Sequence, residues 1–120
     1  MTDLEYYETM IELKAYSPRV IEHQWDDRNK YFSVLVHDDN GNYPDVWLDA
    51  RVYYGDLDVD WNMWIFHDDN EYEQLVKAFM DLSRMFDGYL WDRCYECVEN
   101  YLLTNNLVKW DPDCNYYIDE

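Results

Sequence analysis

The chain has 120 residues, of which 27 are Asp or Glu and only 9 are Lys or Arg, so its formal net charge at pH 7 is −18. Proteins bind DNA, RNA and anionic membranes through clusters of Lys and Arg, so this composition argues against direct binding to any of them. Hydrophobic residues make up 48% of the chain, including 13 Tyr, 6 Trp and 4 Phe, which excludes an intrinsically disordered protein. The length predicts a single domain over residues 1–120 with a substantial core.

The cysteine content and the apolar runs indicate a compartment. Three cysteines, an odd number, argue against a disulfide framework. No apolar run approaches the roughly 18 residues of a membrane span, and no signal peptide opens the chain. We therefore expect a reduced, cytoplasmic protein (in the host cytoplasm if a phage encodes it) that does not bind membranes.

The N-terminal segment permits two interpretations. Thr2 and Glu5 fit a helix capping box, followed by apolar residues at near-helical spacing. The alternative is a strand over residues 9–16, which the β-branched residues and the following Ser17–Pro18 favour. Ser17–Pro18 also predicts the start of a short helix, which a turn at residues 26–29 ends.

The middle of the chain has the pattern of an antiparallel sheet. Residues 31–37 are rich in strand-forming side chains, and Asn40–Gly41 is typical of a tight type I′ hairpin. Residues 45–54 alternate as the return strand. Gly55–Asp56 then turns the chain into a third strand that runs to Phe66. The prediction is a three-stranded antiparallel meander, extended to four or five strands if other segments join it.

After Asn70 the apolar period becomes that of a helix. Asn70 and Glu73 form a capping pair, and an apolar stripe continues until Asp87–Gly88 breaks the helix. A second helix is predicted over about 89–104, and residues 108–120 are predicted to add a short strand at the sheet edge. The predicted fold class is α+β, with both C-terminal helices packed on one face of the sheet.

The third strand carries an unusual row of carboxylates, which we call the acidic row. Period-two alternation places three aspartates on one strand face: Asp56, Asp58 and Asp60. Side chains two residues apart on a strand face are about 6.6–7 Å apart, close to the spacing of successive phosphates along a nucleic-acid strand. Asp is a poor strand former, so β-propensity does not explain the row. We interpret it as a working surface that stands in for a phosphate backbone.

Other candidate partner-binding residues are aromatic side chains that share a face with carboxylates. Trp47, Asp49 and Tyr53 share one face of the 45–54 strand, and Trp64 shares the face of the acidic row. Large aromatic anchors surrounded by charge suit a surface that binds a basic protein. The competing interpretation is that a second layer of structure covers this face.

The tetrad His-Asp-Asp-Asn occurs twice, at residues 37–40 and 67–70. It either ends each strand in polar loop residues or forms a duplicated cation-binding loop, although neither copy follows the calcium-loop pattern. The two copies contribute four further candidate residues to the partner-binding set: Asp38, Asp39, Asp68 and Asp69.

The motifs that could support catalysis are weak. Cys94 and Cys97 have the spacing of a redox or zinc pair, but they lie in mid-helix beside Glu96 and Glu99, which would raise the thiol pKa, and too few further ligands exist for zinc. Asp45 with Asp49-Ala50-Arg51 is too closely spaced for a metal-dependent nuclease signature. We expect no enzyme, no cofactor and no specific metal site.

In size, acidity and aromatic content the chain resembles, as a class, the small DNA-mimic proteins that phages and mobile elements direct against restriction or CRISPR nucleases. Acidic immunity proteins that neutralise nucleases are a neighbouring class. The resemblance implies a stoichiometric inhibitor whose aspartates occupy the DNA, RNA or PAM-reading groove of a basic nucleic-acid-binding protein. The alternatives are an acidic adaptor for another basic protein and, least favoured, a small carboxylate- or metal-dependent enzyme.

Overall fold

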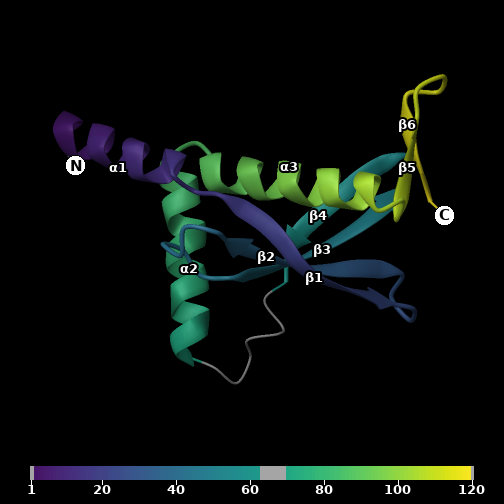
Figure 1. Cartoon of the computed structure of the whole chain (residues 1–120), viewed down its shortest axis with the longest axis horizontal. Coiled ribbons are helices and arrows are strands. Elements are labelled where there is room, and N and C mark those ends of the chain that lie inside the picture. The colour runs from purple at the N-terminus through teal and green to yellow at the C-terminus, as the bar shows by residue number, and fades with distance from the viewer. Residues whose placement is uncertain (1, 63–69, 120) are drawn as a thin grey trace.

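The computed structural model describes residues 2–62 and 70–119. Its elements are α1 (Asp3–Lys14), β1 (Pro18–Asp26), β2 (Tyr31–Asp38), β3 (Val46–Tyr53), β4 (Asp56–Trp61), α2 (Asn70–Met85), α3 (Tyr89–Thr104), β5 (Val108–Asp111) and β6 (Tyr116–Asp119). β1 to β4 form an antiparallel sheet in sequential order, and β5 and β6 form a separate hairpin. Figure 1 shows α1 and this hairpin at opposite ends of the longest axis. The α+β class and the antiparallel sheet are confirmed, with β1 as a fourth strand.

The core lies between one face of the sheet and the helices α2 and α3. Alternate side chains of the central strands are buried, among them Val34, Val36, Val46, Leu48 and Ala50. Four buried residues of α3 cover this face: Leu90, Cys94, Val98 and Leu102. From α2, Phe79 lies with its ring centroid 5.6–5.8 Å from those of Tyr16, Tyr43 and Trp61. We call the buried face of the sheet its inner face and the opposite one its outer face. No helix among the described residues has the length and apolar character needed to cross a membrane.

The predicted strand over residues 9–16 is wrong, because this segment belongs to helix α1. The Thr2 side chain accepts the backbone N–H of Glu5 at 3.2 Å, and acidic residues in the first turn and Lys14 in the last complement the helix dipole. The short helix after Ser17 is also wrong, since β1 begins at Pro18. Proline is tolerated at the first residue of an edge strand, where its missing N–H breaks no ladder hydrogen bond.

The tight hairpin at Asn40–Gly41 is wrong as well, because residues 39–45 form a longer loop between β2 and β3. A type I′ turn needs positive φ at both central residues, and Gly41 has it (70°) whereas Asn40 does not. The buried Asp38 carboxylate organises the loop instead. It accepts the backbone N–H groups of Ser17 at 3.0 Å, Asn40 at 3.2 Å and Asn42 at 3.0 Å.

The C-terminal helices follow the prediction closely. α3 spans the predicted residues 89–104, and Asp87 and Gly88 break the helix before it with φ angles of 58° and 76°. Within α2, Val76 and Phe79 are buried, whereas Leu75 is 56% exposed.

The tail forms the β5–β6 hairpin instead of one edge strand. Its strands pair with each other, and the hairpin docks on the turn between β3 and β4, where the Tyr117 N–H donates to the Gly55 carbonyl at 2.7 Å. The Tyr117 hydroxyl donates to the Glu99 carboxylate of α3. The hairpin is thereby fixed beside the start of β4.

We expect Gly55→Ala to destabilise the fold by more than Gly41→Ala. Both glycines have positive φ, 83° and 70°, so each substitution carries a backbone penalty of about 1 kcal/mol. A Cβ on Gly55 would also lie 3.0 Å from the Tyr116 Cβ, whereas at Gly41 nothing lies within 4 Å. Urea unfolding of both variants measures the difference, and equal losses of stability would contradict close packing of the hairpin on this turn.

Candidate functional site

The acidic row lies where the alternation predicts. In β4 the three aspartates are exposed, and Leu57 and Val59 between them are buried. Antiparallel pairing places Asp56 opposite Tyr53, Asp58 opposite Arg51 and Asp60 opposite Asp49. Directly opposite residues point to the same face of a sheet, so these six side chains share the outer face. β4 ends at Trp61 and Asn62 lies outside the strand, while residues 63–66 of the predicted strand lie outside the described residues.

Two carboxylates lie opposite each other at one end of the outer face formed by β3 and β4. Asp49 and Asp60 are directly opposite, an arrangement that disfavours the sheet when both are charged. The half-buried Asp49 accepts hydrogen bonds from Ser33 Oγ at 3.0 Å and Asn62 Nδ2 at 2.9 Å. Burial raises the pKa of Asp49, the two hydrogen bonds oppose the rise, and the nearby charge of Asp60 adds to it. Burial and the charge of Asp60 therefore both disfavour the ionised form of Asp49 at this position.

Arg51 occupies the centre of the surface. Its Nε lies 3.8 Å from Asp58 Oδ2, with both side chains about half exposed, so the pair is loose and weak. The guanidinium carbon also lies 4.8 Å from the centroid of the Tyr53 ring, within cation–π range. Arg51 thus contacts the Tyr53 ring and only partly neutralises the acidic row.

The aromatic candidates differ in exposure. Tyr53 is 51% exposed, and its ring centroid lies 4.5 Å from that of Tyr54, which is 90% exposed. Trp47 is half-buried, sits opposite Leu35 on the outer face and packs partly against the core. Sequence reasoning missed Tyr54, because it lies at the turn, where strand alternation no longer assigns a face.

The outer face is hollowed beside the acidic row. One cavity of about 190 Å³ is lined by Tyr31, Asp49, Ala50, Arg51, Asp58 and Asp60. A second, of about 520 Å³, is lined by Gln24, Trp25, Asp26, Asp27, Tyr31, Ser33 and Asn62. Tyr31 borders both, and burial, together with the charges of Asp49 and Asp26, raises its phenol pKa. Sequence reasoning missed Tyr31 and Asp26, although two-residue alternation already put Tyr31 on the same face as Ser33.

Asp38 and Asp39 do not belong to this surface. Asp38 is only 1% exposed and is occupied by the loop amides, so it is a structural residue. Asp39 forms an ion pair with Arg19 of β1 at 2.9 Å. Asp38 is the last residue of β2 and Asp39 follows it, beside the start of β3. Asp56 instead pairs with Tyr53 at the end of β3. Trp64, Asp68 and Asp69 lie outside the described residues, and of the second tetrad only Asn70, the first residue of α2, is described.

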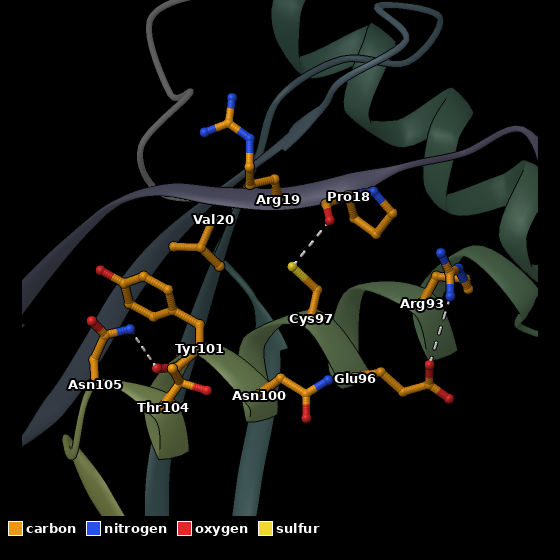
Figure 2. A pocket seen from close by; sticks show the side chains of 10 residues that line it. All are labelled: Pro18, Arg19, Val20, Arg93, Glu96, Cys97, Asn100, Tyr101, Thr104 and Asn105. Carbon is orange, nitrogen blue, oxygen red and sulfur yellow. Dashed lines mark hydrogen bonds and ion pairs between the residues drawn. The ribbon is translucent and has the colours of Figure 1, made fainter.

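A further cleft, of about 410 Å³, lies between β1 and α3 (Figure 2). Cys97 faces β1, and its thiol donates to the Pro18 carbonyl oxygen at 3.4 Å. Arg93 Nη1 lies 3.8 Å from Glu96 Oε2. The Arg19 side chain points away from α3. Burial raises the pKa of Cys97 and raises that of the Cys94 thiol to about 12. A thiolate nucleophile is therefore disfavoured at both positions.

Within residues 2–62 and 70–119, no three His, Cys, Asp or Glu side chains converge as metal ligands would.

Comparison with known proteins identifies no matching family model, no matching curated protein and no matching solved structure. The candidate functional site is the surface formed by β3 and β4.

We expect Asp49→Asn to stabilise the protein at pH 7 by up to about 1 kcal/mol. The raised pKa means that ionisation of Asp49 is harder in the folded than in the unfolded chain, so the stability contribution of this carboxyl falls as the pH rises through its folded-state pKa. An Asn side-chain oxygen can still accept from Ser33 and Asn62. The gain should disappear below about pH 3, where the carboxyl is protonated in both states.

Thermal melts at neutral and acidic pH measure this effect, with Asp58→Asn as the exposed control. The control removes only the loose pair with Arg51 and should change stability by less than about 0.5 kcal/mol. A destabilised Asp49→Asn variant at neutral pH would show that the carboxylate charge supports the fold.

Proposed function

We propose that this protein is a stoichiometric inhibitor whose outer face on β3 and β4 occupies the nucleic-acid groove of a basic protein, such as a restriction or CRISPR nuclease. The observation that carries the proposal is the register of β3 and β4, which holds the acidic row beside Asp49 on one exposed face. A paired strand fixes its carboxylates at intervals of about 6.6–7 Å, so the charges form an array and not a flexible tail.

The charge distribution supports association with a phosphate-binding groove. Lys and Arg side chains in such a groove are positioned for a line of negative charges, which the acidic row supplies on a protein scaffold. The net charge of −18 adds long-range attraction, which speeds encounter with a basic partner. Both contributions weaken as salt screens the charges.

The exposed tyrosines supply the contact area that charge alone does not. Tyr53 and Tyr54 lie next to Asp56, at the start of the acidic row. Tyrosine is enriched among the residues that dominate binding energy at protein interfaces. The stacking of Arg51 on Tyr53 limits the motion of that ring, and so reduces the entropy lost on binding.

The experiment titrates the purified protein into assays of purified restriction and CRISPR nucleases, with cytochrome c as a basic protein that has no nucleic-acid site. We expect one-to-one inhibition of a susceptible nuclease, relief of inhibition by excess nucleic acid, and a steep loss of binding between about 50 and 200 mM salt. Cytochrome c should bind weakly. Tight binding that nucleic acid does not compete with would contradict mimicry and favour the adaptor alternative.

A further inference from the structure

Helix α1 exposes an apolar stripe on the side that faces away from the molecule. Its inner side is fixed by Leu13, which is fully buried, and by Tyr6, whose ring centroid lies 4.9 Å from that of Phe86. The exposed residues are Leu4, Tyr7 and Ile11, at 68%, 71% and 66% exposure. Spacings of three and four residues align them along one line, which we call the α1 stripe. Figure 1 shows α1 extending beyond the sheet at the N-terminal end of the molecule.

A row of carboxylates runs beside the α1 stripe. Glu5, Glu8 and Glu12 are exposed and each directly follows a member of the stripe in sequence. At 100° per residue, each glutamate lies on the same flank of the apolar line. An apolar seam flanked by charges of one sign is how paired helices select a partner of opposite charge.

The charges identify the occupant. Burying a side chain the size of Leu or Ile contributes about 1.5–3 kcal/mol, so a partner that covers the α1 stripe gains several such contributions. A second copy would bring another strongly acidic chain, of net charge −18, against this one, and an anionic membrane would be repelled for the same reason. A surface rich in Lys or Arg would instead pair with the glutamates.

We infer that the α1 stripe docks a basic amphipathic helix of a partner protein. The 12 residues of α1 extend about 18 Å, enough for roughly three turns of a partner helix with apolar residues at i, i+3 or i+4, and i+7 and with Lys or Arg beside them. This surface is separate from the acidic row, so the inference stands or fails independently of the function proposed above.

The test uses a synthetic helical peptide of about 18 residues, with Leu along one face at helical spacing and Lys beside it. Binding to ¹⁵N-labelled protein is followed by chemical-shift changes and by calorimetry. We expect shifts centred on α1, binding at least tenfold weaker for Leu4→Gln/Ile11→Gln, and unchanged binding for Leu75→Gln, a similarly exposed leucine on α2. Glu5→Gln/Glu8→Gln/Glu12→Gln should weaken binding several-fold. All variants should stay folded, with only a small fall in melting temperature for the glutamate variant, because Glu5 complements the dipole of α1.

Each of three outcomes would overturn the inference. Equal binding of a scrambled peptide of the same composition, or of the Leu4→Gln/Ile11→Gln variant, would show general attraction to an acidic molecule. No detectable binding at millimolar peptide would show that the stripe does not dock a basic helix. Concentration-dependent self-association in sedimentation, abolished in Ile11→Gln, would identify the occupant as a second copy. Unchanged peptide binding after substitution of the acidic row would keep this surface distinct from the proposed inhibitory one.

Discussion

Replacing Asp56, Asp58 and Asp60 with Asn is expected to weaken binding to a susceptible nucleic-acid-binding protein on the order of 100-fold. Each charge-assisted hydrogen bond from a partner Lys or Arg contributes about 1 kcal/mol or more, and about 1.4 kcal/mol corresponds to a tenfold change in affinity. The substituted side chains are exposed and nearly isosteric, so the fold should be retained. The melting temperature should stay constant or rise, because Asp60 no longer faces Asp49 as a second negative charge. Calorimetry and the nuclease inhibition assay measure affinity and function in parallel.

The matched control removes the same number of charges from the helices. Glu71, Asp92 and Glu96 are exposed on α2 and α3, and their replacement by Gln, Asn and Gln lowers the net charge equally. If the array on β4 is the binding surface, the control variant should retain affinity within about threefold at physiological salt, where charges beyond about 8 Å are screened. Equal weakening by both variants would show that bulk charge, and not the geometry of the acidic row, drives binding.

The acidic row could be predicted because strand alternation is a local property. Asp56, Asp58 and Asp60 alternate with buried residues within one short segment, so a period of two was sufficient to place them on one face. The neighbours of the row depend on strand register, which loop lengths and tertiary packing determine. The opposition of Asp49 and Asp60 therefore emerged only from the structure.

The N-terminal helix was the less favoured of two predictions because the β-branched residues and Ser17–Pro18 favoured a strand. The apolar residues of the helix also point in two directions. Leu13 is turned toward the core, whereas Leu4 and Ile11 are turned toward solvent. A helix that is apolar on both sides lacks a clear 3.6-residue period, so alternation over residues 9–16 suggested a strand. The exposed apolar residues that obscure the helical period belong to the α1 stripe, which supports the further inference. The exposed side of α1 therefore both weakens the helical pattern in the sequence and forms the candidate docking surface.

The buried carboxylate of Asp38 was also placed wrongly from sequence, and its substitution should have the second large effect. Asp38→Ala is expected to destabilise the fold by about 3 kcal/mol, because three backbone N–H groups are deprived of a charged acceptor at once. For a domain of this size that corresponds to a fall in melting temperature of about 10 °C.

The adjacent Asp39→Ala is the matched control: it removes an exposed ion pair with Arg19 and should cost less than about 1 kcal/mol of folding stability. Affinity for a susceptible nuclease, measured below the melting temperature of each variant, should be nearly unchanged in both. A large fall in affinity in Asp39→Ala with stability intact would instead extend the binding surface to the loop between β2 and β3, and would restore the wider set of aspartates that the sequence suggested.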